Sequence, residues 1–159
     1  MPIYMQYPGC NGSVTTKGYE KWIELESAQF GMNRPMDSRL GNASYASSGK
    51  LQISEIHISK STDNASPQLA IQAMQGKFDS KVKITFVTTT AQGVSEILRY
   101  DLTDTGISSF QLSGGSSGAP MESYSLSFSK FEFTFHGMDK SAAANPQRGG
   151  YDLAAAKSL

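Results

Sequence analysis

The amino-acid sequence predicts a mainly β protein: a compact β-barrel of two antiparallel sheets with one α-helix at its side and one long extended loop. Three observations lead to this prediction. Apolar and polar residues alternate with period two along most of the chain, which is typical of strands with one buried face. Two of the alternating segments change phase midway. Only one segment has apolar residues at helical spacing.

The alternation predicts about seven or eight strands, separated by turn-forming residues. In Lys81–Thr89, for example, Val82, Ile84 and Phe86 share one face. We expect hairpin turns at Gln92-Gly93 and at residues 104–106, where Asp-Thr-Gly separates two apolar segments. In chain order the expected strands cover Ile3–Tyr7, Tyr19–Phe30, Leu51–Lys60, Lys81–Thr89, Leu98–Leu102, Phe110–Leu112 and Tyr124–His136.

The two strands that change phase support a folded-over architecture. In Leu51–Lys60 the apolar residues move from odd to even positions, and in Tyr124–His136 they move from even to odd. A shift of one residue turns every following side chain to the other face. Each strand therefore needs a bulge or passes from one sheet to the other, as strands at the corners of a small barrel do.

One helix is predicted, over residues 67–75. Ser66 is expected to be its N-cap, and Pro67 suits the first turn because its missing N–H is not needed there. Gly76 is placed to end the helix in a left-handed conformation. The apolar stripe expected to pack on the barrel consists of Leu69, Ala70, Ala73 and Met74.

Two segments show no period. Met32–Lys50 is rich in Ser, Gly and Asn, and a connection of this length inside one domain is usually functional or disordered. Ser113–Pro120 is a Gly/Ser-rich hairpin tip. The remaining alternation is continuous enough that residues 1–159 are predicted to form a single domain.

Composition and charge exclude several classes of function. Lys and Arg together number 14, as do Asp and Glu, so no basic field exists to attract nucleic acid or an anionic membrane. No stretch is apolar enough to insert in a membrane. Cys10 is the one cysteine, which allows no internal disulfide. Residues 1–6 do not form a signal peptide, so we expect a protein made in the cytoplasm without a cleavable leader.

The search for catalytic groups finds no motif for a nucleophile, a phosphate loop or a metal site, so we expect no enzyme activity, cofactor or metal. His57 and His136 have no metal-ligand neighbours at suitable spacing and are interpreted as structural. Glu24 and Glu26 could form a carboxylate pair for hydrolysis, but on a strand they indicate a solvated or interface face. From these residues alone the sequence predicts a β-barrel with a side helix and a surface loop.

The order of these elements resembles the Hcp family, the tube-forming proteins of bacterial type VI secretion. The strongest match is Lys60–Gly76, where a strand ending in Lys leads through Asp and a Ser-Pro pair into the helix that ends at Gly. A second is the aromatic strand end at residues 30–32 before the Gly/Ser-rich loop. The others are the hairpin at 113–118 leading into residues 124–131, and the closing strand at 150–153.

The resemblance implies a structural subunit of the secretion tube. Six copies would form a ring, and rings would stack into a hollow tube inside a contractile sheath. Contraction would expel the tube with its tip (spike) protein, carrying small effectors in the lumen, so the protein would become extracellular. The Ala-rich segment after Gly137 and the tail 154–159 depart from the family pattern, which leaves the packing of the tail open.

The resemblance also suggests which residues serve assembly. The ring-stacking loop is expected to include Met32, Asn33, Arg34, Arg39 and Tyr45. Gln29 is the expected lumen contact for cargo, because a polar side chain near the end of an apolar strand face does not suit a core.

Three alternatives stay open at this point. They are a phage-like tail-tube subunit, a carbohydrate-binding β-sandwich that uses Trp22 and tyrosines, and a hydrolase that uses Glu24 and Glu26.

Overall fold

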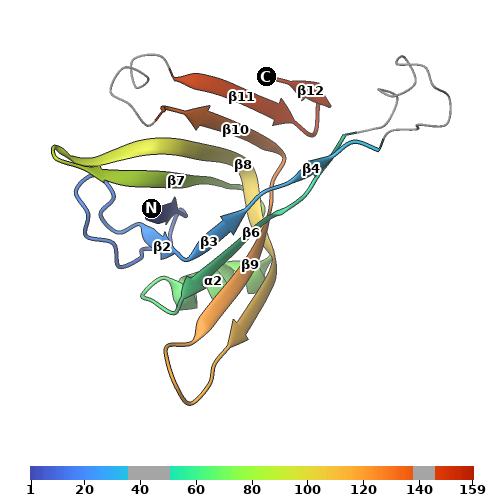
Figure 1. Ribbon diagram of the computed structural model, residues 1–159. Helices are drawn as coiled ribbons and strands as arrows, with labels where there is room; N and C mark the ends of the chain where they lie inside the picture. The colour runs from blue at the N-terminus through green and yellow to red at the C-terminus, as the bar shows by residue number, and fades with distance from the viewer. Residues whose placement is uncertain (36–50, 138–145) are drawn as a thin grey trace.

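The computed structural model describes residues 1–35, 51–137 and 146–159. Within them are one helix and twelve strands (Figure 1). The strands are β1 (Ile3–Gln6), β2 (Ile23–Leu25), β3 (Ser27–Gln29), β4 (Met32–Asn33), β5 (Gln52–Ile53), β6 (Ile56–Ser61), β7 (Ser80–Thr90), β8 (Gly93–Ser113), β9 (Met121–Ser127), β10 (Lys130–Phe135), β11 (Gln147–Asp152) and β12 (Lys157–Ser158). The helix is α2 (Ser66–Gln75).

Strand β8 organises the sheet, because its two halves pair with different strands. The first half lies between β7 and β10, in the order β12-β11-β10-β8-β7-β1-β2. The second half, from Gly106 onward, pairs with β9, which continues to β6 and β3. We call these the large branch and the small branch. In Figure 1 the large branch lies across the top and the small branch runs down to the β8–β9 hairpin.

The mainly β prediction with one helix is confirmed, but the barrel is not, because the sheet is open. Strands β2 and β3 stand at two ends of the strand order, where β2 pairs with β1 and β3 pairs with β6. They do not pair with each other. Glu26 joins them through the chain, and its N–H donates to the carbonyl of Ser59 at 2.8 Å. The predicted strand Tyr19–Phe30 is therefore two short strands.

The two phase changes predicted from the sequence are changes of sheet. Residues 124–136 divide into β9 in the small branch and β10 in the large branch. Residues 51–60 divide into β5, which pairs with β4 in a separate two-stranded ribbon, and β6 in the small branch. The change of face occurs where each chain crosses between sheets.

The predicted hairpin turn at residues 104–106 is wrong, because β8 continues through it as one strand of 21 residues. The chain bends there: Asp104 has a positive φ of 49°. Gly106 is needed because a Cβ at this position would lie 2.4 Å from both the Lys77 carbonyl oxygen and the Phe78 ring. The turn-forming residues thus mark the point at which one strand leaves the large branch for the small one.

The core fills the angle between the two branches. Its fully buried side chains come from both, and α2 adds Leu69. A second, smaller cluster on the outer side of the large branch joins Tyr4, Val14 and Val87 with Tyr19 and Trp22. The main cluster includes Met5, Tyr7, Ile23, Leu25, Ile56, Ile58, Val82, Ile84, Leu102, Ile107, Tyr124, Leu126 and Phe131.

The helix forms as predicted but begins differently. Its N-cap is Ala65, which has no side chain to cap it, and Ser66 is the first helical residue. Gly76 ends the helix in the left-handed conformation, as expected. The apolar stripe is narrower than predicted, since Leu69 is buried but Met74 is 81% exposed. No helix in the described residues is long and apolar enough to cross a membrane.

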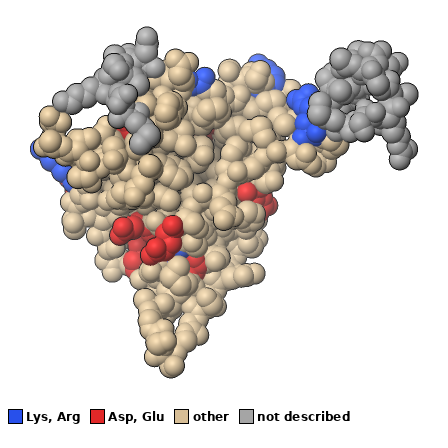
Figure 2. Space-filling view, viewed as in Figure 1, with Lys and Arg blue, Asp and Glu red and all other residues tan. Residues whose placement is uncertain are grey.

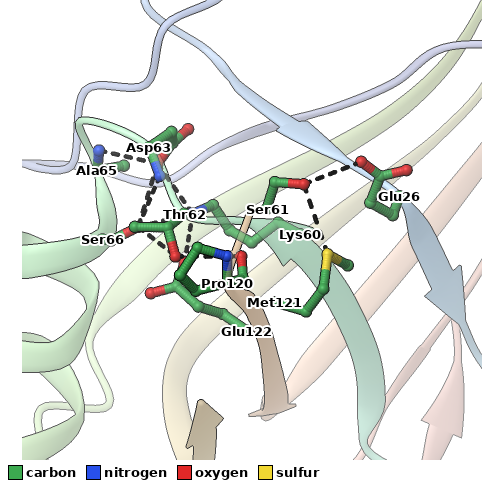
Figure 3. A network of polar contacts seen from close by, with 10 residues as sticks. All are labelled: Glu26, Lys60, Ser61, Thr62, Asp63, Ala65, Ser66, Pro120, Met121 and Glu122. Carbon is green, nitrogen blue, oxygen red and sulfur yellow. Dashed lines mark hydrogen bonds and ion pairs between the residues drawn. The ribbon is translucent and has the colours of Figure 1, made fainter. Parts of the chain in front are cut away.

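Ser66 belongs instead to a buried polar cluster around Lys60, which we call the Lys60 cluster (Figure 3). The Lys60 ammonium is fully buried and lies 2.6 Å from Glu122 Oε2, 2.9 Å from Asp63 Oδ1 and 2.9 Å from Ser66 Oγ. Ser66 Oγ in turn donates to Glu122 Oε2 at 2.7 Å and accepts from the Asp63 N–H at 2.9 Å. These contacts fix β6, β9 and the start of α2 to one another.

We predict that Lys60→Met destabilises the protein by about 3–5 kcal/mol, because it leaves the Glu122 carboxylate buried without its cation. Urea unfolding measures the loss. The matched control is Lys83→Met, at an exposed position of β7. It should change the free energy of unfolding by less than about 0.5 kcal/mol. Equal effects at the two positions would contradict the structural role of the cluster.

Candidate functional site: a polar face on the small branch

The outward side of the small branch carries a regular array of uncharged polar side chains, which we call the polar face. Strand register places them in two rows across β3, β6, β9 and the second half of β8. The first row is Gln29, His57, Ser125 and Ser109, and the second row is Ser27, Ser59, Ser123 and Gln111. Each row therefore takes one side chain from every strand of the branch.

Period-two alternation produces this face. In β6, Ile56, Ile58 and Lys60 point into the core and are buried, so His57 and Ser59 between them point outward. In β9, buried Tyr124 separates Ser123 from Ser125 in the same way. The inward positions supply the core, and the outward positions that form the two rows are hydroxyl, amide or imidazole groups.

Hydrogen bonds join neighbouring strands across the polar face. Ser27 Oγ lies 2.6 Å from Ser59 Oγ. In the other row His57 Nδ1 lies 2.9 Å from Ser125 Oγ, and Ser109 Oγ donates to Ser125 Oγ at 2.8 Å. These short contacts hold the side chains in fixed orientations, so the face presents an ordered set of donors and acceptors.

The polar face is hollowed. A surface cavity of about 380 Å³ is lined by all eight of its side chains, with Ile58 and Tyr124 at its floor. None of these residues is Asp, Glu, Lys or Arg. The hollow can therefore accept a ligand through hydrogen bonds but offers no fixed charge to attract or repel one.

The outer side of the large branch has the opposite character. Strand pairing brings Lys83, Asp101 and Glu132 side by side across β7, β8 and β10. Arg99 Nε donates to Asp101 Oδ2 at 2.9 Å. We call these four residues the charged face. In the view of Figure 2 the β8–β9 end of the molecule carries no charged side chain, whereas charged groups lie on its body.

The residues predicted from the family resemblance lie in two places. Gln29 is exposed and belongs to the polar face. Met32 and Asn33 form β4, which pairs with Ile53 and Gln52 of β5, and Arg34 follows as an exposed residue. These three lie on the ribbon and not on the polar face. The other two predicted residues, Arg39 and Tyr45, lie outside the described residues.

Sequence analysis interpreted His57 as structural and did not place it on the polar face, where the structure has it. The signal was present, since His57 lies between two apolar residues of an alternating strand and so had to face away from the core. His136 lies elsewhere, on the outer side of the large branch, with Nε2 2.8 Å from Glu96 Oε1. The two histidines are thus in different environments.

The alternative sites proposed from the sequence do not form. Trp22 is half-buried and packs edge-on against Tyr19 at 5.1 Å between ring centroids, so it offers no open platform for a sugar. Glu24 lies opposite Tyr4 of β1, whereas Glu26 accepts a hydrogen bond from Ser61 of β6. Neither carboxylate lines the hollow of the polar face.

No group of metal-binding side chains occurs in the part of the chain that the structure describes. Cys10 is buried, and burial raises the pKa of its thiol to about 11. It therefore stays protonated at neutral pH and is a poor nucleophile. The polar face, with its uncharged hydrogen-bonding groups, is the candidate site that the geometry leaves.

Comparison with known structures supports the fold. The chain is similar to a type six secretion system protein of known structure, with a TM-score of 0.87, 23% identity and 99% of each chain covered. It is also similar to Hcp1 from Salmonella typhimurium, with a TM-score of 0.75, 22% identity, and 99% of this chain and 98% of that one covered. The secreted protein Hcp3 from Pseudomonas aeruginosa has a TM-score of 0.64 and 19% identity over 95% of this chain and 97% of that one.

No curated protein sequence matches the chain. The family model described as "Type VI secretion system effector, Hcp" matches residues 4–135, which is more than half of the 159 residues. It spans β1 to β10 and so includes the polar face and the Lys60 cluster. On this match the chain belongs to the Hcp family of the type VI secretion system.

Proposed function

We propose that this protein is a tube subunit and not an enzyme. Six copies of the single domain form a ring, and rings stack into a hollow tube inside the sheath. Contraction expels the tube with its tip protein and with effectors held in the lumen. In this proposal the polar face lines the lumen and binds cargo, and the protein moves from the cytoplasm to the exterior with the tube.

One observation carries the proposal: the two uncharged rows of the polar face. A carrier surface must bind cargo reversibly and stay hydrated when empty. Serine hydroxyls and glutamine amides both donate and accept hydrogen bonds, so they can bind many polypeptide surfaces weakly. Fixed charges would favour cargo of one sign and repel the other. The polar face meets this requirement, and the charged face does not.

The edges of the small branch suit a ring of copies. Within the described residues, β3 pairs only with β6 along one edge, and the second half of β8 pairs only with β9 along the other. Such edges present unpaired backbone N–H and C=O groups. Pairing of β3 with β8 of the next copy is a heterologous contact, which closes into a ring when the rotation between copies allows it.

The ribbon of β4 and β5 suits contact between rings. It runs away from the body of the molecule toward the upper right of Figure 1. Met32 is 53% exposed on it, and Arg34 follows it as an exposed cation. An exposed apolar side chain next to a charge is suited to docking on another molecule. We assign the ribbon to the stacking of one ring on the next.

The ring has a direct test in its mass. Native mass spectrometry of the purified protein should give a species near six times 17.2 kDa. Light scattering at several concentrations should give the same mass. A monomer throughout the micromolar range would contradict the tube assignment, since a subunit that does not associate cannot build a lumen.

The cargo contact is tested with Gln29→Arg. The substitution adds a charge to an uncharged face at each copy, and covering this charge with cargo costs free energy. Rings should persist, while effector that co-purifies with them should fall by at least about tenfold, or about 1.4 kcal/mol. The matched control is Gln68→Arg, which makes the same change at an exposed position of α2. Unchanged cargo with Gln29→Arg would remove this residue from the site.

Stacking is tested with Met32→Ser combined with Arg34→Glu. Electron micrographs should show separate rings where the parent protein forms stacks, because the apolar and cationic contacts of the ribbon are both lost. Lys17→Glu, an exposed charge reversal away from the ribbon, should leave stacks intact. Stacks of normal length in the double variant would place the contact between rings elsewhere.

A further inference from the structure

His57 is the one histidine among the eight side chains of the polar face, and histidine is the residue type that serves as a charge switch near neutral pH. It is exposed on β6, which lies between β3 and β9, and it pairs with Gln29 on one side and Ser125 on the other. The remaining seven side chains of the face are serines and glutamines. The charge of the polar face in this pH range therefore depends on whether His57 carries a proton.

The hydrogen bonds around His57 suit a neutral imidazole. Ser109 donates to Ser125 Oγ at 2.8 Å, which leaves the hydroxyl hydrogen of Ser125 free to be donated onward. His57 Nδ1, at 2.9 Å, is placed to accept it. In the tautomer whose proton is on Nε2, a chain of donors runs from Ser109 through Ser125 to Nδ1, and this chain needs a neutral imidazole.

We infer that the polar face binds uncharged, hydrogen-bonding segments of cargo while His57 is neutral and releases them when His57 is protonated. The inference rests on the proposed function, because it assigns the cargo class and the regulation of the same surface. It follows from the position of one imidazole among otherwise uncharged side chains and from its 2.9 Å contact with the hydroxyl of Ser125.

Protonation acts in two ways. Nδ1 becomes a donor, so the hydroxyl hydrogen of Ser125 loses its acceptor, and Ser125 is only 7% exposed. A buried donor without a partner is unfavourable. In addition, cargo that covers the face removes water from the imidazolium, which is costly for an unpaired charge. Cargo and proton therefore compete: affinity is full at high pH and falls as pH decreases, by up to about tenfold per pH unit for one coupled proton.

None of the groups that line the hollow around His57 carries a compensating charge. From β3 and the second half of β8 the face contributes only serine and glutamine. Tyr124 of β9 points inward, and burial raises the pKa of its hydroxyl, so it stays neutral. Two carboxylates flank the polar face: Glu55, two residues before His57 in the chain, accepts a hydrogen bond from Ser108, and Glu26 accepts one from Ser61. Both already have hydroxyl partners, and neither lines the hollow.

The test uses the purified ring and two fluorescein-labelled peptides of equal length. One is an uncharged Ser/Gln/Asn repeat, and the other has Glu at several of these positions. Fluorescence anisotropy is measured at about pH 8 and about pH 5.5, on either side of the usual histidine range. The uncharged peptide should bind about tenfold or more weakly at the lower pH, and its affinity at the higher pH should not depend on salt. The Glu peptide should gain affinity as pH falls.

Variants identify the group responsible. His57→Asn keeps an acceptor for Ser125 but cannot be protonated, so it should bind the uncharged peptide equally at both values of pH. His136→Asn, which removes the other histidine, should leave the pH dependence unchanged. Equal binding to the parent ring at both values of pH, no peptide binding at all, or a pH dependence that persists in His57→Asn would each overturn the inference.

Native mass spectrometry at both values of pH separates this inference from the proposed function. If no ring forms at either pH, the proposed function fails. If the ring persists and peptide affinity is the same at both values of pH, only the inference about His57 fails. If the ring itself dissociates at the lower pH in both the parent and His57→Asn, pH acts on assembly, and the role given to His57 is overturned.

Discussion

The interaction of the buried Lys60 ammonium with Glu122, Asp63 and Ser66 is the constraint on which the small branch depends. A lysine whose side chain is 0% exposed loses its hydration, and the protein must replace it with close partners. Those partners come from β9, from the turn before α2 and from α2 itself. Satisfying one charge therefore fixes two strands and the start of the helix at once, and only one register of β6 against β9 places Lys60 opposite Glu122.

This register also produces the polar face. Lys60 and Ile58 point inward from β6, so His57 and Ser59 point outward. A slip of one residue would turn Lys60 to solvent and bring His57 into the core. The buried ion pair and the uncharged surface are thus formed by opposite faces of the same strand. Since an apolar pair could fill the core equally well, we attribute the charged cluster to specifying this register.

Much of the fold follows from the sequence because period-two alternation and its phase changes are local signals. The shift between Phe128 and Phe131 predicted a bulge or a change of sheet, and the pairings of β9 and β10 show a change of sheet. The continuation of β8 past Asp104 was not predictable, because Asp-Thr-Gly is turn-forming and only the tertiary contact of Gly106 with Phe78 gives it another role. The burial of Lys60 was missed for a similar reason, since its partner Glu122 is remote in sequence. Of the polar face, sequence analysis named only Gln29. The other seven side chains are brought beside it by strand register, which the sequence alone does not give.

We propose above all that in the assembled protein the polar face lines the channel and the charged face does not. Electron cryo-microscopy of the purified rings tests this directly, because the strands of the small and large branches are distinguishable in a map. We expect the map to show β3, β6, β9 and the second half of β8 around a central hole, with Gln29, His57 and Ser123 pointing into it. A hole lined instead by Lys83, Asp101 and Glu132, or an assembly without a hole, would contradict it.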